Sequence, residues 1–177
     1  MRTLTAPCRF EETIKHSRFI AHAAPVSSQA DTLAFFETVA DPGATHNCWA
    51  WRVDGVHRFN DDGEPAGTAG RPILSVLEGR RLDRLMVVVT RHYGGIKLGV
   101  GGLARAYSGC AAKCLDGAEL AEIQKRLAFN LAADYAWADV IHRLLAEYGA
   151  RKLGESPAGD GLGLRVEIGE SRFEPLC

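Results

Sequence analysis

The chain has 177 residues, a formal net charge of −1, and 46 % apolar and 24 % charged residues, which is the composition of a globular protein. The near-neutral charge argues against a generally basic nucleic-acid binder, and no apolar run is long enough to cross a bilayer. Residues 1–7 lack the apolar stretch of a signal peptide, and five scattered cysteines fit a reducing compartment. We therefore expect a cytoplasmic protein with no membrane partner.

The first elements predicted along the chain are two short strands, 10–15 and 18–24, joined by a tight turn. Ser27 or Ser28 can cap a helix that ends near Val39, because a serine side chain accepts a hydrogen bond from the unpaired amides of a first turn. The pattern is therefore a hairpin followed by a helix.

An aromatic-rich strand is predicted over 45–53, with Trp49 and Trp51 on the same side because side chains alternate along a strand. The next two residues, Asp54 and Gly55, form a strong hairpin turn, since a type I′ turn needs positive φ at both central positions. A return strand follows.

The middle of the chain predicts two helices around a buried strand. Pro72 suits the first turn of a helix. The run 85–90 is short, continuous and rich in β-branched residues, which is typical of a strand buried on both faces. A helix then begins near Gly102, with an apolar stripe from Leu103 to Cys114.

A second unit begins near Lys125, with alternating strands over 127–131 and 162–168, a weaker strand over 151–155 and a helix capped by Asp134. A turn is expected over 157–161 and one helical turn near Glu170. This β-α-β-β pattern lacks an α-β completion. We expect an open sheet edge, available to a protein partner or to self-association.

The predicted architecture is α+β in two domains, 1–120 and 125–177. The second domain is incomplete by its pattern, so it reads as truncated.

The strongest candidate for a binding site is a segment rich in glycine and in cationic residues. Six glycines lie between Gly94 and Gly109, and glycine leaves backbone amides open beside a helix start. Eight cations face two anions in residues 65–115, a net charge of +6. The alternatives are chance clustering of charge and glycines that only permit close packing. The candidate anion- or nucleic-acid-binding residues are Arg71, Arg91, His92, Tyr93, Gly94, Gly95, Lys97, Gly99, Gly101, Gly102 and Arg105.

An acidic loop precedes this segment, and its possible ligand residues are Asp61, Asp62, Glu64, Gly67 and Thr68. Three carboxylates could hold a cation such as magnesium. We favour the alternative, a turn whose aspartates cap neighbouring backbone and the next helix and whose threonine braces the loop. No second carboxylate cluster lies nearby in sequence, so we predict no metal and no cofactor.

No catalytic residue is assigned. His46, His57 and His92 could act as bases, but no Ser-His-Asp or Cys-His order is recognisable. Residues 99–104 match the dinucleotide pattern G-x-G-x-x-A, yet the preceding strand ends near Thr90, too early for the tight strand-to-helix turn that the motif requires.

Residues 12–115 resemble the IMPACT/YigZ family. The resemblance is carried by 61–70, 72–74, 87–99 and 101–107, together with 44–51 upstream. It implies an N-terminal α/β sandwich like domain IV of elongation factor G and a small C-terminal ferredoxin-like domain. Eukaryotic relatives regulate translation by restraining a stress-response kinase through an additional N-terminal domain, for which this chain has no room. The resemblance therefore points to a bacterial-type member and supplies no catalytic residues.

Two functions remain open. The leading hypothesis is a non-enzymatic RNA- or ribosome-associated protein with a role in translation, which expects Arg71, Arg91, Lys97 and Arg105 to converge. The alternative is a small enzyme acting on a phosphorylated metabolite or nucleotide, with the glycine-rich loop holding phosphate. That alternative expects a deep pocket joining the acidic loop to residues 94–102.

Overall fold

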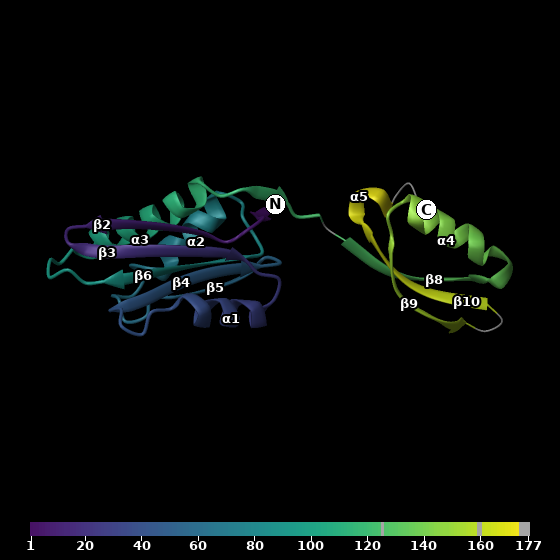
Figure 1. The fold of residues 1–177 in the computed structure, drawn as a ribbon, viewed down its shortest axis with the longest axis horizontal. Helices are drawn as coiled ribbons and strands as arrows, with labels where there is room; N and C mark the ends of the chain where they lie inside the picture. The colour runs from purple at the N-terminus through teal and green to yellow at the C-terminus, as the bar shows by residue number, and fades with distance from the viewer. Residues whose placement is uncertain (125, 159–160, 174–177) are drawn as a thin grey trace. The chain divides into compact units, whose positions relative to one another are not determined.

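A computed structural model describes residues 1–124, 126–158 and 161–173 (Figure 1). The chain forms two compact units, residues 1–123 and 124–177. Each unit combines helices with antiparallel sheet, so the expected mixture of α and β structure is confirmed. The domain ranges and the named fold likenesses stay predictions.

The N-terminal unit is built on a five-stranded sheet in the order β2-β3-β6-β4-β5, and every neighbouring pair is antiparallel. The register places Ala21 opposite Val89 and Ala50 opposite Val87. The strands are β2 (Cys8–Ile14), β3 (Ser17–Pro25), β6 (Leu85–His92), β4 (His46–Val53) and β5 (Val56–Asn60).

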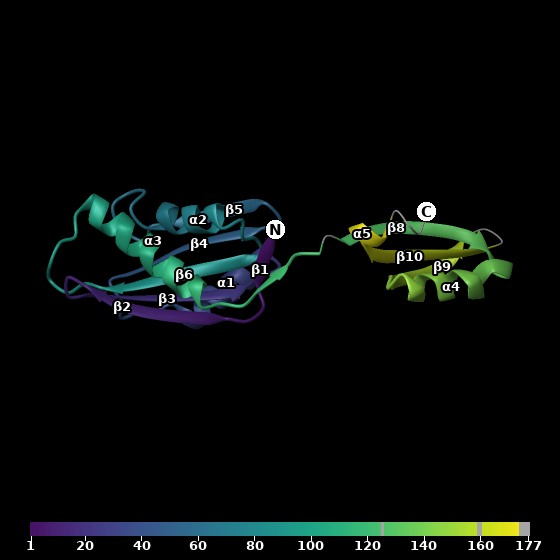
Figure 2. The ribbon, with the colours of Figure 1, turned by 90° about the horizontal axis from the view of Figure 1, so that it is seen from above.

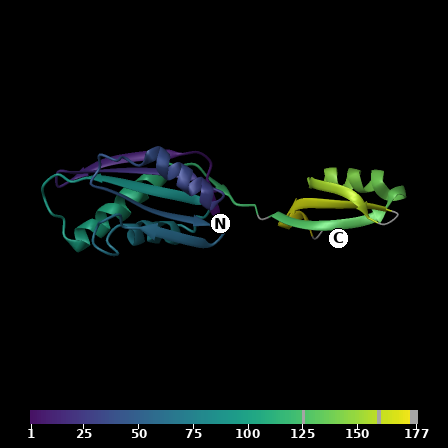
Figure 3. The same ribbon diagram turned by 90° about the horizontal axis from the view of Figure 1, so that it is seen from below.

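Helices cover both faces of this sheet. On one face lie α2 (Gly70–Gly79) and α3 (Val100–Asp116), and on the other lies α1 (Gln29–Val39), as Figures 1 and 2 show from two directions. In Figure 3 α1 lies in front of the sheet. The central strand β6 is buried from Leu85 to Arg91, as predicted for a strand covered on both sides.

The main core lies between the sheet and helices α2 and α3, and a smaller cluster lies beneath α1. Phe19 and Tyr107 meet edge to face in the main core, with ring centroids 5.3 Å apart. Trp51, Met86 and Val88 form the centre of the smaller cluster. Strands β1 (Arg2–Leu4) and β7 (Leu120–Glu122) pair beside the main sheet.

Local signals account for most boundaries. Ser28 caps α1, because its hydroxyl accepts a hydrogen bond from the amide of Asp31 at 3.1 Å. Asp54 and Gly55 have φ of 50° and 82°, as a type I′ turn requires. The start predicted for α3 at Gly102 is two residues late: the helix begins at Val100, because Gly99 at φ 74° turns the chain into it.

The C-terminal unit is a three-stranded sheet in the order β8-β10-β9, with one helix before β9. The alternating apolar residues 162–168 of β10 are all buried, as predicted. Within the described residues, β8 is hydrogen-bonded to β10 alone, so its other edge carries no strand. The elements are β8 (Arg126–Asp134), a 3₁₀ turn (Tyr135–Trp137), α4 (Ala138–Glu147), β9 (Arg151–Ala158), β10 (Gly161–Gly169) and α5 (Glu170–Phe173).

One detail of this unit differs from prediction: Asp134 precedes the 3₁₀ turn and makes no side-chain cap. Trp137, the last residue of that turn, is 60 % exposed. The predicted unit start at Lys125 and residues 159–160 of the predicted turn lie outside the described residues. Across the described ranges, no helix is both long and apolar enough to span a membrane.

Candidate functional site

The glycine loop, residues 93–102, connects β6 to α3 and includes the first three residues of that helix. Part of its glycine content is structural: a Cβ atom on Gly94 would lie 1.9 Å from the carbonyl oxygen of His16 in the β2–β3 turn. Gly95 and Gly99 have φ of 89° and 74°, a region that favours glycine. The close-packing alternative therefore holds for Gly94, whereas a Cβ on Gly95 or Gly99 would meet nothing.

The start of α3 is an exposed helix N-terminus without a side-chain cap. The first amide with a backbone acceptor is that of Leu103, which donates to the carbonyl of Gly99 at 2.9 Å. Within the part of the chain that the structure describes, the amides of residues 100–102 therefore have no backbone acceptor, and they lie at the positive end of the helix dipole. Lys97 and Arg105 are exposed on either side of this turn.

Two hollows lie beside the loop. The Glu64 pocket, about 450 Å³, brings Glu64, Arg91, Tyr93, Lys97 and Gly99 together with Thr45 and His46. The Arg105 pocket, about 270 Å³, is lined by Arg105, Gly102 and Lys15. Leu98 borders both hollows. Seven of the candidate residues therefore line these hollows, five in the Glu64 pocket and two in the Arg105 pocket.

A buried polar network forms the floor of the Glu64 pocket. Arg91 and Glu64 are 4 % and 8 % exposed, and Arg91 Nη1 donates to Glu64 Oε1 at 2.6 Å. The Tyr107 hydroxyl donates to the same oxygen at 2.7 Å. Burial raises the pKa of Tyr107, so the phenol keeps the proton that it donates. Arg91 is therefore held by protein groups within the network.

The +6 segment does not form one cationic surface. Five of its cations are held by carboxylates, in the pairs Arg71–Glu78, Arg80–Asp116, Arg84–Asp54, Arg91–Glu64 and Lys113–Glu12.

The four cations expected to converge are placed differently. Arg71 lies on α2 and lines neither hollow, and Arg91 is buried. Lys97 and Arg105 alone of the four are exposed and form no ion pair with any residue that the structure describes.

The acidic loop supports the capping alternative. The carboxylate of Asp61 accepts hydrogen bonds from the amides of Gly67, Ala69 and Gly70 at 2.8, 3.0 and 2.8 Å, so it caps α2. Asp62 accepts from the amide of Asn47 at 2.6 Å.

The remaining candidates also have structural roles. The Thr68 hydroxyl donates to the carbonyl of Pro65 at 2.6 Å, so it braces its own loop. His92 lines neither hollow and lies 3.3 Å from Asp41. The described residues contain no group of three or more His, Cys, Asp and Glu side chains that could hold a metal.

Sequence reasoning missed two residues of this site. Thr45 Oγ1 accepts from the amide of Tyr93 at 2.9 Å and so fixes the loop's start. Tyr107 is predicted only as part of an apolar stripe, yet it anchors Glu64. The available signal was its hydroxyl, because a buried tyrosine needs a hydrogen-bond partner.

The buried cysteines are poor nucleophiles. Burial raises the pKa of Cys48 and of Cys110 to about 12. Because the thiolate is the reactive form, both side chains remain inert thiols at neutral pH. Neither lines the hollows beside the glycine loop.

The raised pKa of these two thiols predicts that the protein loses stability at high pH. An ordinary cysteine ionises near pH 8.5, so the folded state holds more protons than the unfolded state between that pH and about 12. Their contribution is fully present below pH 8.5 and declines as the pH rises, by up to about 1.4 kcal/mol per thiol and pH unit. Urea unfolding at pH 8 and 10 measures this slope. Cys48→Ala should have a shallower slope, and an unchanged slope would contradict the assignment.

Comparison with known proteins places the N-terminal unit in a family. The model of the Impact N-terminal domain matches residues 15–115. An IMPACT family member of Thermus thermophilus is 52 % identical over 102 residues, which is 58 % of this chain and 56 % of that protein. YvyE of Bacillus subtilis is 42 % identical over 142 residues, 77 % of this chain and 65 % of YvyE. The chain thus spans between half and two thirds of these relatives.

The similarity extends to a solved structure. A crystal structure described as a hypothetical protein overlaps 99 % of this chain and 88 % of its own chain, with a TM-score of 0.83 and 32 % identity. The family model covers more than half of the residues, in the region where the glycine loop, the acidic loop and the buried network lie. The chain belongs to the IMPACT family.

Proposed function

We propose that this chain binds RNA, free or on the ribosome, through the N-terminal end of α3 and acts in translation without catalysing a reaction. The observation that carries the proposal is an uncapped helix N-terminus flanked by Lys97 and Arg105, two exposed cations with no ion pair among the described residues. The role in translation rests on the family resemblance. Such a role belongs in the cytoplasm.

The proposed contacts follow from the chemistry of the loop. A phosphate group accepts hydrogen bonds from the open amides of residues 100–102, where the helix dipole also favours negative charge. Lys97 and Arg105 neutralise adjacent phosphates. Tyr93 is 44 % exposed and offers a ring on which a base can stack. Arg71 and Arg91 are not part of this proposal, because each already pairs with a carboxylate.

Removing the two exposed cations is expected to weaken RNA binding. The double variant Lys97→Ala/Arg105→Ala should lose about a hundredfold in affinity, since each of the two lost charge-assisted hydrogen bonds costs about 1.5 kcal/mol or more. The slope of log affinity against log salt should become shallower by about 1.4, at about 0.7 per phosphate on a single strand. Fluorescence anisotropy with labelled single-stranded RNA, double-stranded RNA and ribosomal subunits measures both quantities.

The matched control is Arg71→Ala, which removes an exposed cation of the same charged segment that lines neither hollow. Its affinity should stay within twofold of the wild type. No binding at low salt, or equal binding by the double variant and the wild type, would remove the proposal.

An enzyme remains the second candidate, because the Glu64 pocket brings His46 and Glu64 into the same hollow as Lys97. Against it, the Glu64 oxygen that lies 3.8 Å from His46 Nε2 already accepts from Arg91 and Tyr107. If the substrate is a phosphorylated molecule, calorimetric titration of the protein with inorganic phosphate or ATP should show saturable binding. Loss of that binding in His46→Ala, with RNA binding unchanged, would favour the enzyme.

A protein partner at the edge of β8 is a separate proposal. This nine-residue strand is hydrogen-bonded on one side only within the described residues, and an unpaired edge can accept another strand. Pull-downs with the full chain and with residues 1–124 would locate such a partner on the C-terminal unit.

A further inference from the structure

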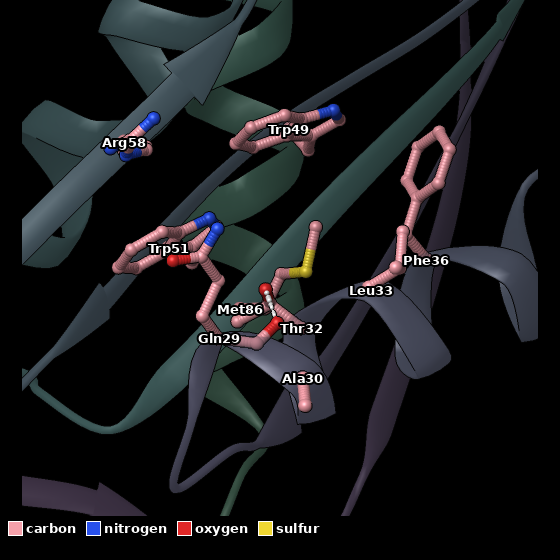
Figure 4. Close-up of a pocket in the computed structure, with 9 residues that line it drawn as sticks. All are labelled: Gln29, Ala30, Thr32, Leu33, Phe36, Trp49, Trp51, Arg58 and Met86. Atoms are coloured by element: carbon pink, nitrogen blue, oxygen red, sulfur yellow. Dashed lines mark hydrogen bonds between the residues drawn. The ribbon is translucent and has the colours of Figure 1, made fainter.

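A second surface lies on the other side of the five-stranded sheet, where no candidate residue was predicted. The tryptophan groove, about 600 Å³, lies between α1 and the strands β4, β5 and β6 (Figure 4). Its floor and walls are the side chains of Trp49, Trp51, Phe36 and Met86. The volume falls within the range of small-molecule sites in proteins, about 300–1,000 Å³.

The aromatic walls are fixed by the register of the strands. Trp49 and Trp51 are two residues apart on β4 and so share a face, and Arg58 of the edge strand β5 is the direct cross-strand neighbour of Trp51. Phe36 of α1 meets Trp49 edge to face at a centroid distance of 6.5 Å. The groove thus has a firm aromatic lining before any ligand binds.

The polar groups of the groove are few and lie beside this lining (Figure 4). Arg58 is exposed, and within the described residues its guanidinium forms neither an ion pair nor a hydrogen bond. Gln29 contributes the amide of the first residue of α1. Guanidinium groups bind carboxylates and phosphates in a bidentate manner, so the groove combines stacking surface with one site for an anion.

We propose that the tryptophan groove binds a small planar aromatic molecule that carries an acidic group. The ring lies against the indole of Trp49, where offset stacking and edge contacts are favourable, and the carboxylate or phosphate pairs with Arg58. Arg58 supplies the charge complementarity that a purely apolar partner would leave unused. This site uses different residues from the RNA site, so each proposal can fail without the other.

The experiment uses the full chain with Trp137→Phe, because Trp137 is exposed in the other unit and its signal is then removed. The two remaining indole N–H signals in a ¹H–¹⁵N spectrum report on Trp49 and Trp51 during titration, and calorimetry gives the affinities. The probes are 2-naphthoate with its neutral analogue 2-naphthalenemethanol, and adenosine 5′-monophosphate with adenosine. The two pairs separate aromatic carboxylates from nucleotides.

At least one acidic probe should shift both indole signals and bind about tenfold more tightly than its neutral analogue. Arg58→Gln should abolish that preference, while Arg71→Gln, a matched change of an exposed arginine on α2 at the other face of the sheet, should leave it intact. Ala30→Leu, which adds volume at the groove wall, should weaken every probe. The proposal is overturned if no probe binds at millimolar concentration, if neutral analogues bind equally well, or if Arg58→Gln binds as the wild type does.

Discussion

Glu64→Ala is expected to lower the free energy of unfolding of the N-terminal unit by about 3–5 kcal/mol, the range for breaking a buried ion pair by removing one partner. The substitution leaves the guanidinium of Arg91, 4 % exposed, without its carboxylate. It also removes the acceptor of the Tyr107 hydroxyl, which lies in the main core. Urea unfolding, followed by the fluorescence of Trp49 and Trp51 in the Trp137→Phe background, measures the change.

The control is Asp116→Ala, which removes the carboxylate of the exposed pair with Arg80. Exposed pairs contribute about 0–1 kcal/mol, so this variant should unfold close to the wild type. Tyr107→Phe should fall between the two, since it removes one hydrogen bond and keeps the ion pair. If Glu64→Ala and Asp116→Ala cost the same, Glu64→Ala does not leave Arg91 as an unpaired buried charge, and the description of the pocket floor is wrong.

The network also changes how the loop sequence is interpreted. Arg91 is predicted as an anion ligand and Glu64 as part of a ligand loop. In the structure these two side chains form an ion pair with each other. The pair joins the end of β6 to the acidic loop, and Tyr107 adds α3 to the same point. The network therefore holds together the segments that surround the Glu64 pocket.

Local signals predicted the elements well because they act within a few residues. The Asp54-Gly55 turn, the serine cap of α1 and the apolar run 85–89 of β6 each follow from a short window of sequence. The same holds for the shared face of Trp49 and Trp51, which follows from strand alternation alone.

The ion-pair partner of each cation could not be predicted from such short windows. Lys113 pairs with Glu12 across 101 residues, and Arg91 pairs with Glu64 across 27. A count of charge along the sequence omits such partners, so a segment of net +6 keeps few exposed, unpaired cations after folding. The tryptophan groove escaped prediction for a related reason: its two walls come from α1 and from strands β4, β5 and β6, which are separated in sequence.

The second large effect is expected at Gly94. Gly94→Ala would place a Cβ atom 1.9 Å from the His16 carbonyl oxygen and 2.1 Å from its carbon. Both are backbone atoms of the β2–β3 turn, which cannot move aside as a flexible side chain could. We expect a loss of about 3 kcal/mol in the free energy of unfolding, at the upper end of overpacking costs, measured by the same urea titration.

Gly109→Ala is the matched control, because it makes the same chemical change inside α3, where an added Cβ would meet nothing within 4 Å. Alanine is the better helix former, so this variant should gain about 0.5–1 kcal/mol. The two variants should therefore differ in sign. If Gly94→Ala were as stable as Gly109→Ala, the glycine loop would not pass against the β2–β3 turn, and the position of Lys97 beside the start of α3 would have to be reconsidered. If instead Gly94→Ala folds but loses RNA affinity together with stability, the close contact at His16 is what holds the loop in its binding conformation.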